Sequence, residues 1–352
     1  MNVSIKDLKY IYEKEIKLHV KNKERLFKFE RNKLEYFHSM KNTLVNNSYN
    51  GGIYNIFIVK EPKKRVVMSQ SVYDKVINHY IARHILMPKL SNRLSPFNVA
   101  TRKNMGLDYG IKLLKELIQK YKLKGEVYYI KLDIKKYFFN IDHKVLLSKL
   151  KSYLDIDEYN LIKRVLSSTN KEYINKVISC FQKKYDEELP IYKCGKGLPI
   201  GGLVSQFLAI YYLSDLHHYI RHNLHLEFIS YMDDYIVLSN DKEYLVKCLD
   251  IIEDKLKYEY KLQINKKKTY ICNIKNGLPF LGYIFSIKNN RIIVRNGKEK
   301  VKKIKKGIKK TINGYEEGKI SFQKAFCSLE NYMNCDRFTN TYQVKNIIDS
   351  NA

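Results

Sequence analysis

The spacing of hydrophobic and polar positions along the chain predicts a protein that mixes helices and strands. Apolar residues recur every three to four positions in several segments, which is typical of helices with one buried face. A capping box at Ser4–Asp7 begins a charged helical stretch that extends to about Tyr36, and Pro88 is expected to end a later helix. The main predicted helices are 72–87, 106–121, 203–220, 242–256 and the segment from 298 onward.

Shorter apolar runs, each bounded by turn residues, predict strands. Two of them flank the turn at 61–64 and should form a hairpin, and two others enclose the acidic pair Asp233 and Asp234. No internal repeat and no low-complexity linker interrupts the chain, so we expect one mixed α+β body with appended segments. The predicted strands are 53–59, 65–68, 127–133, 226–231, 235–238, a short strand near Leu262, 269–274 and 280–285.

Composition adds a strong positive charge. The chain of 352 residues has 65 Lys and Arg against 36 Asp and Glu, a formal net charge of +29. A polyanionic partner is therefore expected, with nucleic acid ahead of an anionic membrane surface. The 30 Tyr and 15 Phe residues provide flat faces suited to base stacking, although most of them are expected in the core.

Other classes of protein are disfavoured. No apolar run approaches the ~18–20 residues that span a bilayer, and the N-terminus has no apolar segment of a secretory signal. The six cysteines form no C-x-x-C pair, which argues against common zinc sites and a disulfide framework. We therefore expect a cytoplasmic protein with reduced thiols and no membrane partner.

Three aspartates occupy positions where a metal ion would be useful. Asp133 ends a predicted apolar strand, and Asp233 and Asp234 lie between two apolar runs. Carboxylates at such positions are costly unless neutralised, and their hard oxygen atoms suit Mg²⁺. Two neighbouring strands could hold two ions roughly 3.5–4 Å apart, the arrangement used in phosphoryl transfer. A helix cap at Asp133 and a simple turn at 233–234 are the alternatives.

The order of several motifs resembles that of reverse transcriptases. Tyr231-Met232-Asp233-Asp234 is similar to the family's Y-x-D-D hairpin, and 131–138 is similar to its first palm motif. The glycine-rich stretch 197–206 resembles the loop and helix below the nascent base pair. Further matches are the lysine-bearing 265–269, the primer grip at 280–283 and the fingers residues Arg65 and Arg102.

The resemblance implies an α+β fold of the right-hand polymerase type, with an antiparallel palm sheet backed by helices. Residues 1–125 would form an N-terminal helical extension and the fingers, and 126–290 the palm, with helices in 142–190 partly in the fingers. Residues 291–352 would form a short basic thumb. Lys298–Lys310 contains eight lysines, and Val301, Ile304, Ile308 and Ile312 recur at helical spacing, so one face should pack while the others stay basic.

The same resemblance implies an RNA-directed DNA polymerase that extends a primer by two-metal nucleotidyl transfer. Asp133, Ile134, Asp233 and Asp234 would bind two Mg²⁺ ions, for which Mn²⁺ is a possible substitute. Lys268 would protonate the leaving pyrophosphate, with Lys266 and Lys267 as alternatives. Phe138 would exclude the ribose 2′-hydroxyl and so favour deoxynucleotides.

The resemblance assigns the remaining site residues to two groups. The residues expected to contact the incoming nucleotide are Arg65, Arg102, Tyr137, Phe138, Ile200, Gly201 and Gln206. Those expected to contact primer or template are Tyr231, Met232, Phe280, Leu281, Gly282, Tyr283, Lys302, Lys303 and Lys306.

The glycine-rich loop carries information about the subclass. Most reverse transcriptases resemble Q-G-x-x-x-S-P here, whereas this chain has Ile200 in place of Gln and Ser205-Gln206 in place of Ser-Pro. The pattern resembles bacterial enzymes of diversity-generating retroelements, or related uncharacterised and defence-associated groups. An isoleucine cannot hydrogen-bond near the incoming sugar, so reduced fidelity is a hypothesis, with a packing role for Ile200 as the alternative.

The implied partners are template RNA, an RNA/DNA duplex and dNTPs, with a noncoding RNA and an accessory protein as further candidates. Alternative functions stay open. The chain could be an antiphage defence enzyme that makes cDNA from a noncoding RNA, or one that makes untemplated or protein-primed DNA. It could also be a non-catalytic RNA-binding scaffold, which the intact aspartates disfavour. An RNA-dependent RNA polymerase is disfavoured by Phe138.

A histidine-rich tract at 217–225 invites a metal-binding interpretation. His218 and His222 are one helical turn apart, and His225 follows. No H-E-x-x-H pattern or cysteine partner accompanies them. We therefore favour a surface helix whose histidines contact nucleic acid over a metal site.

Overall fold

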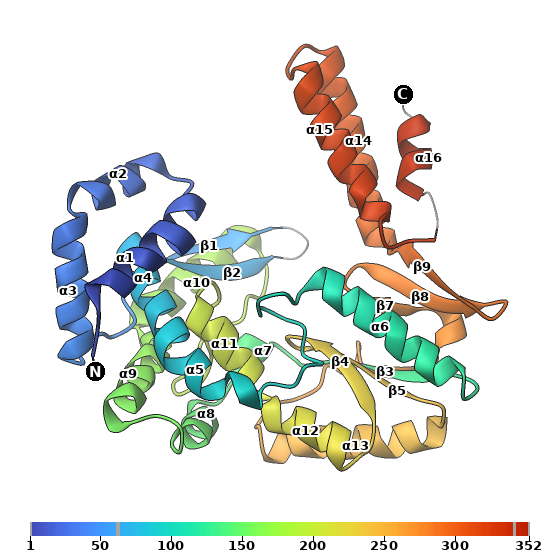
Figure 1. Cartoon of the computed structure of the whole chain (residues 1–352), viewed down its shortest axis with the longest axis horizontal. Coiled ribbons are helices and arrows are strands. Elements are labelled where there is room, and N and C mark those ends of the chain that lie inside the picture. The colour runs from blue at the N-terminus through green and yellow to red at the C-terminus, as the bar shows by residue number, and fades with distance from the viewer. Residues whose placement is uncertain (1, 61–63, 341–342, 351–352) are drawn as a thin grey trace. The chain divides into compact units, whose positions relative to one another are not determined.

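A computed structural model describes residues 2–60, 64–340 and 343–350 of the chain (Figure 1). Three residues of the predicted turn at 61–64 lie outside the described residues. The chain divides into two compact units, each assembled from three separate segments. The first unit comprises Met1–Thr101, Asp133–Asn223 and Ile251–Asn265, and the second comprises Arg102–Leu132, Leu224–Asp250 and Lys266–Ala352.

The N-terminal helical region is interrupted, which corrects the prediction of one helix to Tyr36. Ser4 caps the first helix as expected, because its side chain accepts a hydrogen bond from the Lys6 amide. Val20 is extended, and the Asn22 side chain caps a new helix by accepting from the Arg25 amide at 2.8 Å. The segments are α1 (Ile5–Ile11), a π-helix (Tyr12–Ile16), a 3₁₀ turn (Lys17–His19), α2 (Lys23–Arg31) and α3 (Lys33–Val45).

The predicted hairpin is confirmed as β1 (Tyr54–Val59) and β2 (Arg65–Gln70), which pair antiparallel. Residues of β1 alternate between buried and exposed, as expected for a sheet with one covered face. Ile56 and Met68 belong to the covered face, where they join a hydrophobic cluster that includes Ile174 and Ile178 of α10 (Glu172–Tyr185).

Helices make up the rest of the first unit. The prediction that Pro88 ends a helix was wrong, because Pro88 lies in the first turn of α5, where its missing amide donor costs little. The predicted helix 203–220 is divided at Leu213 into two helices. The helices are α4 (Val72–Tyr80), a π-helix (Ile81–Leu86), α5 (Met87–Leu90), a 3₁₀ turn (Ser91–Arg93), α7 (Tyr137–Asn140), α8 (His143–Leu150), α9 (Ile156–Ser167), a 3₁₀ turn (Ser168–Asn170), α11 (Leu203–Tyr212) and α12 (Ser214–His222).

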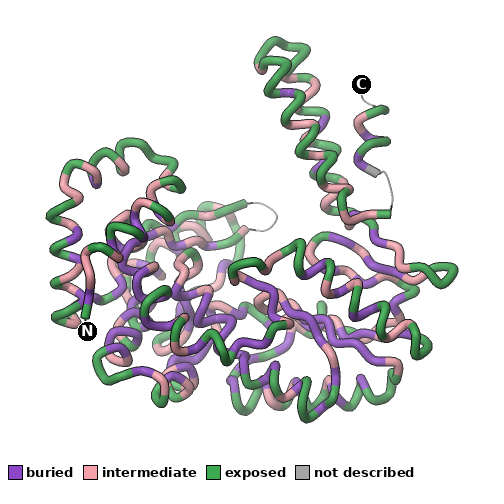
Figure 2. Tube along the Cα trace, viewed as in Figure 1, coloured by how far each residue is buried: buried purple, intermediate pink, exposed green. Residues whose placement is uncertain are grey.

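A four-stranded sheet forms the centre of the second unit. Its strand order is β4-β5-β3-β6, with β3 antiparallel to β6 and β4 antiparallel to β5. Helix α6 (Leu107–Lys122) contacts β4 and β5. Strands β3, β4 and β5 carry many buried residues, drawn in purple in Figure 2, whereas β6 carries none. The strands are β3 (Tyr128–Asp133), β4 (Glu227–Tyr231), β5 (Asp234–Ser239) and β6 (Tyr270–Asn273), and α13 (Lys242–Tyr258) follows β5.

A second sheet and a helical segment complete this unit. The strands are ordered β7-β8-β9, and α14 follows them. Ile304 and Ile308 of α14 are buried with Val344 and Ile347, which confirms the predicted apolar face. The elements are β7 (Leu278–Phe280), β8 (Tyr283–Lys288), β9 (Arg291–Asn296), α14 (Lys298–Glu316), α15 (Phe322–Met333), two 3₁₀ turns (Ile274–Asn276 and Asn334–Asp336) and α16 (Gln343–Asp349).

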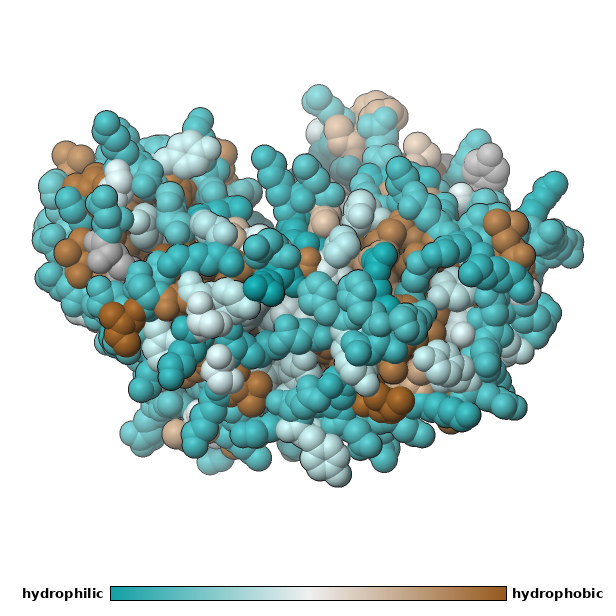
Figure 3. Space-filling model, turned by 60° about the horizontal axis from the view of Figure 1, so that its bottom comes forward, coloured by the Kyte–Doolittle hydropathy of each residue, from teal (hydrophilic) through white to brown (hydrophobic). Residues whose placement is uncertain are grey.

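Much of the face shown in Figure 3 is polar. On this face, hydrophobic side chains are scattered among hydrophilic ones. No helix in the part of the chain that the structure describes has the length and apolar character needed to span a bilayer.

Candidate active site

The acidic pair lies at the tip of the β4–β5 hairpin, as predicted. Tyr231 pairs with Asp234, so Met232 and Asp233 form a two-residue turn. Met232 has a φ of 58°, the left-handed conformation that tight hairpin turns require. The hairpin therefore presents two successive carboxylates, Asp233 in the turn and Asp234 as the first residue of β5.

Asp133 is the last residue of β3, and β3 and β5 are neighbours in the sheet. Asn265 holds Asp133 from two directions. Its side-chain amide donates to Asp133 Oδ2 at 3.0 Å, and its backbone amide donates to the Asp133 carbonyl at 2.7 Å. Ile134 is buried and forms an isolated bridge with Ile264. Asn265 was noted in the sequence only as part of the lysine-bearing motif, and its role as a partner of Asp133 was missed.

Lys131 is a second residue that sequence reasoning missed. Its ammonium forms an ion pair with Asp234, and its side chain is only 14% exposed. The same Nζ lies 6.0 Å from the centre of the Phe280 ring. Lys131 precedes Asp133 by two residues in one strand, so both side chains point to the same face of the sheet. This spacing of two residues in a predicted strand could have identified Lys131 as a neighbour of Asp133.

The lysine-bearing turn lies beside the end of β3. Tyr270 of β6 pairs with Lys131 of β3 in an antiparallel register. Lys268 precedes Tyr270 by two residues, and Asp133 follows Lys131 by two, so the register brings the turn 266–268 to the level of Asp133. All three lysines of this turn are exposed.

The chemistry of the three aspartates fits Mg²⁺, because carboxylate oxygens are the hard donors that this ion prefers. Within the described residues, however, no three or more Asp, Glu, His or Cys side chains are gathered as a metal-binding group. The ammonium of Lys131 is paired with Asp234. A divalent ion that binds Asp234 would therefore have to share or displace this ion pair.

The glycine-rich loop is joined to two other predicted motifs by backbone hydrogen bonds. The Met68 amide of β2 donates to the Ile200 carbonyl at 2.8 Å, and the Leu198 amide donates to the Phe138 carbonyl at 2.7 Å. Gly201 has a φ of 133°, and a Cβ there would lie 2.8 Å from the Met68 carbonyl oxygen. Only glycine allows this approach, so the structure brings β2, the loop and α7 together.

Helix α7 carries the two adjacent aromatic residues predicted to contact the nucleotide. Lys136, before the helix, has a left-handed φ of 47°. The Tyr137 side chain is buried, and its hydroxyl donates to the Ala209 carbonyl of α11 at 2.5 Å. Phe138 is half-buried, and its ring lies 5.8 Å from the Tyr137 ring in an edge-on arrangement. The packed Tyr137 thus supports the position of Phe138.

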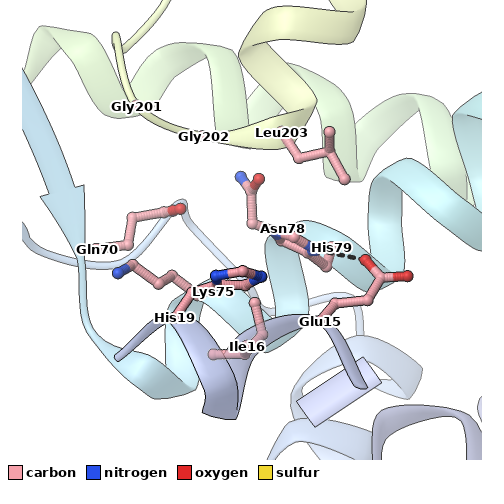
Figure 4. A pocket seen from close by; sticks show the side chains of 10 residues that line it. All are labelled: Glu15, Ile16, His19, Gln70, Lys75, Asn78, His79, Gly201, Gly202 and Leu203. Carbon is pink, nitrogen blue, oxygen red and sulfur yellow. Dashed lines mark hydrogen bonds and ion pairs between the residues drawn. The ribbon is translucent and has the colours of Figure 1, made fainter. Parts of the chain in front are cut away.

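Asn78 of α4 connects the N-terminal region to the loop, and no sequence signal identified it. Gly202 is the N-cap of α11 and has no side chain to cap it, but Asn78 Oδ1 accepts from the Val204 amide at 3.0 Å. Figure 4 shows the Asn78 side chain directed toward Gly201 and Gly202. Gln206 is half-buried in the first turn of the same helix.

His143 of α8 is a buried histidine that supports the loop. Its ring Nε2 lies 2.7 Å from the Gly197 carbonyl oxygen, so Nε2 carries a hydrogen and donates. Burial lowers the pKa of His143, while the Gly197 hydrogen bond and the charge of Asp142 act in the opposite direction. The ring is therefore neutral in the folded protein near pH 7.

We expect the free energy of unfolding to fall as the pH is lowered below about 6.5, the usual histidine pKa in an unfolded chain. The unfolded chain then takes up a proton that folded His143 resists, so the stability present above this pH is lost. Urea unfolding at pH 7.5 and 5.5 measures the difference. His79, whose pKa burial also lowers, acts in the same direction. His143→Gln should reduce the pH dependence, and an unchanged dependence would contradict this assignment.

The two arginines predicted to contact the nucleotide differ in their burial and in the unit to which they belong. Arg65 is the exposed first residue of β2 and pairs with Val59. Arg102 belongs to the second unit and is half-buried, and burial lowers its pKa. Arg65 therefore belongs to the same unit as the glycine-rich loop, whereas Arg102 belongs to the other unit.

Four of the predicted primer residues, at 280–283, form a tight hairpin in the second unit. Phe280 pairs with Tyr283, and Leu281 and Gly282 both have positive φ angles in the turn. Lys300 of α14 lies with its Nζ 3.6 Å from the centre of the Tyr283 ring. Lys302, Lys303 and Lys306 are exposed on α14, away from its buried face.

The histidine-rich tract shows no metal-binding group. His217 is buried, whereas His218 and His222 are exposed on α12 with rings 6.0 Å apart. His218 Nε2 lies 2.9 Å from the Arg93 carbonyl oxygen, within hydrogen-bonding distance. Across the described residues no cluster of metal-binding side chains forms here.

We next compared the chain with known protein families and solved structures. The model of the family described as reverse transcriptase (RNA-dependent DNA polymerase) matches residues 58–285. No curated protein sequence matches the chain. Among solved structures, apo telomerase from Candida tropicalis is similar, with a TM-score of 0.52 and 13% identity, over 81% of this chain and 52% of that chain.

Telomerase from Candida albicans, solved in complex with the TWJ fragment of telomeric RNA, matches with a TM-score of 0.49 and 13% identity. That match covers 87% of this chain and 58% of that chain. The chain therefore spans about half the length of the telomerases it resembles. At this identity the likeness to Candida tropicalis telomerase shows a shared polymerase fold.

Proposed function

This chain belongs to the reverse transcriptase (RNA-dependent DNA polymerase) family, and we propose that it extends a primer with deoxynucleotides on an RNA template. The observation that carries the proposal is the β4–β5 hairpin. It presents Asp233 and Asp234 beside the strand that ends in Asp133, and all three residues fall within the family match.

Asp133, Asp233 and Asp234 would hold the divalent ions, with the backbone of Ile134 adjacent to them. When bound, Mg²⁺ lowers the pKa of the primer 3′-hydroxyl and neutralises the triphosphate and the leaving pyrophosphate. Asn265 orients the Asp133 carboxylate through its side-chain amide. Lys268 Nζ gives a proton to the leaving pyrophosphate, with Lys266 and Lys267 as alternative donors.

The nucleotide would be held by residues around the glycine-rich loop. Arg65 contacts its phosphates, and Phe138 closes the space where a ribose 2′-hydroxyl would extend. Ile200 and Gly201 lie against β2, which supports a role in shaping the base-pair pocket. Arg102, Tyr137 and Gln206 complete the proposed nucleotide contacts. Primer and template would be held by Tyr231, Met232, Phe280, Leu281, Gly282, Tyr283, Lys302, Lys303 and Lys306.

The proposed regions are fingers with the N-terminal extension at 1–125, a palm at 126–290 and a thumb at 291–352. The exposed lysines of α14 support a role along the phosphates of an RNA/DNA duplex. We place the protein in a bacterial cytoplasm, with a noncoding RNA and an accessory protein as candidate partners.

Primer extension by the purified chain tests the proposal. A labelled DNA primer annealed to an RNA template is incubated with dNTPs and Mg²⁺, Mn²⁺ or a chelator. Template-directed DNA product that requires the divalent ion supports polymerase activity. Salt-sensitive RNA binding without any product, in either metal and with several primers, would contradict it and indicate an RNA-binding scaffold.

Ile200 bears on the subclass, for which we propose a diversity-generating retroelement, with a defence enzyme as the alternative. Ile200 packs against the hydrophobic cluster of β1, β2 and α10. We expect Ile200→Gln to lower the misincorporation rate about two- to ten-fold, because one added hydrogen bond near the incoming sugar favours the correct geometry. Sequencing of cDNA from a defined RNA measures the rate. Ile200→Leu is the matched control, and equal error rates in both variants would leave Ile200 with a packing role only.

A further inference from the structure

A large cavity in the first unit lies outside the proposed catalytic residues. It has a volume of about 1150 Å³ and extends from the segment before α2 to the β1–β2 hairpin and the start of α4. We call it the N-terminal groove. Its volume exceeds the ~300–1,000 Å³ of ordinary small-molecule sites. Most of its lining residues precede residue 58, where the family match begins.

Among the charged residues that line the N-terminal groove, cations outnumber acids. Lys21, Arg25, Lys28 and Lys75 line it, and none of them forms an ion pair with another described residue. Burial and the nearby charge of Arg25 lower the pKa of Lys75, so like charges face one another here. An anionic ligand would relieve this repulsion.

Asp74 is the one acidic residue among the described lining residues. It is buried, and it accepts hydrogen bonds from the Ser71 hydroxyl at 2.7 Å and the Tyr49 hydroxyl at 3.2 Å. The Asp74 carboxylate therefore interacts with neighbouring hydroxyl groups and does not pair with the groove cations. The groove keeps a net positive charge.

Aromatic rings lie among these cations. Phe57 is 40% exposed on the outer face of β1, opposite the face that packs on α10. Across the groove lining, Tyr36 of α3 and Tyr73 of α4 are half-buried and meet edge to face at 5.9 Å. An exposed ring and cations that line one groove are the combination with which single-stranded nucleic acids are bound, by stacking of bases and neutralisation of phosphates.

The groove adjoins a smaller cavity of about 220 Å³ that reaches the glycine-rich loop. Both cavities are lined by His19, Gln70 and Lys75, and the smaller one is also lined by Gly201 and Gly202. Figure 4 shows Lys75 and His19 on the side of this cavity opposite the loop. A strand in the groove would therefore lead toward the loop.

We propose that the N-terminal groove binds a single strand of nucleic acid. Arg25, Lys28 and Lys75 contact its phosphates, and Phe57 stacks on a base. The inference goes beyond polymerase chemistry, because it gives residues 1–57 a binding role that needs no divalent ion. It also accounts for the cations Arg25 and Lys28 of α2, which have no carboxylate partner among the described residues.

Fluorescence anisotropy of a labelled single-stranded RNA of about 12 nucleotides tests the proposal on the full chain. Arg25→Glu/Lys28→Glu should weaken binding at least about ten-fold and lower the salt slope of log K by about 0.7 for each phosphate that the variant no longer neutralises. Phe57→Ala should weaken it roughly ten-fold with little change in the salt slope. Arg25→Gln/Lys28→Gln should give a smaller reduction in the same direction.

Lys6→Glu/Lys9→Glu is the matched control, because both lysines are exposed on α1 and line neither cavity. Equal reductions in affinity in groove and control variants would overturn the proposal, since they would reflect net charge alone. Unlabelled single-stranded RNA and DNA serve as competitors and distinguish the two sources of the strand. A duplex that competes as well as either would overturn the single-strand assignment.

Catalysis and groove binding can fail separately. Absence of primer extension in wild-type protein with intact groove binding would remove the polymerase proposal alone. Unchanged binding in Arg25→Glu/Lys28→Glu and in Phe57→Ala, with primer extension present, would contradict the groove proposal alone. Thermal unfolding of each variant confirms that the fold persists.

Discussion

Asp233→Ala is expected to reduce RNA-templated DNA synthesis by about 10³-fold or more. Removal of one carboxylate from a two-ion site costs several kcal/mol of charge stabilisation in the transition state, and each 1.36 kcal/mol is ten-fold in rate. Single-turnover primer extension with saturating dNTPs measures the reduction. Raising the Mg²⁺ or Mn²⁺ concentration should recover part of the rate if weakened ion binding is the cause.

The fold should tolerate this change. The left-handed conformation of the turn falls on Met232, and the pairing of Tyr231 with Asp234 uses backbone groups, so alanine at 233 brings no strain. Asp250→Asn is the matched control, because Asp250 is an exposed carboxylate on α13. Full activity in Asp233→Ala would exclude a catalytic role for the hairpin, and equal reductions in both variants would exclude a specific one.

Phe138→Ala is expected to raise the use of ribonucleotides relative to deoxynucleotides by roughly 10–10²-fold. A rigid ring that excludes one oxygen atom supplies discrimination of about this size. Two contacts make Phe138 rigid. Its ring packs against the buried Tyr137, and the Phe138 carbonyl accepts a hydrogen bond from the Leu198 amide of the glycine-rich loop. The ratio of kcat/KM for a ribonucleotide and its deoxy counterpart measures the effect.

Phe138→Tyr is the conservative control, since it keeps the ring and should keep the discrimination. The deoxynucleotide rate of Phe138→Ala should change less than the ribonucleotide rate. A variant that loses both rates equally would identify Phe138 as a packing residue of α7. An unchanged ratio of ribonucleotide to deoxynucleotide kcat/KM in Phe138→Ala would contradict the role of Phe138 in excluding ribonucleotides.

Local sequence predicted the elements that carry the proposed chemistry. Two apolar runs around Met232 and Asp233 predicted the β4–β5 hairpin, and one apolar run predicted the strand that ends in Asp133. The helical spacing of Ile304 and Ile308 predicted the buried face of α14. These features depend on periods of two and 3.6 residues, which the sequence displays directly.

The sequence did not identify the residues that hold the site in place, because their hydrogen-bond partners are distant in the chain. Lys131 reaches Asp234 over 103 residues, Asn265 reaches Asp133 over 132, and Asn78 reaches the Val204 amide over 126. A single Lys or Asn has no local pattern that identifies such a partner. Breaks in helices were missed for a similar reason, since Asn22 and Pro88 can each begin a helix as well as end one.

By itself the sequence determined the family, the α+β class and the three aspartates proposed to hold metal, because each rests on short motifs in a fixed order. Only the tertiary structure decided which side chains surround them. It paired Lys131 with Asp234, directed Asn265 to Asp133, and lined one groove with the cations of α2 and the outer face of β1. The physical reason is that packing sets which distant residues share a cavity or a hydrogen bond, whereas local periodicity reports only which face of an element is buried.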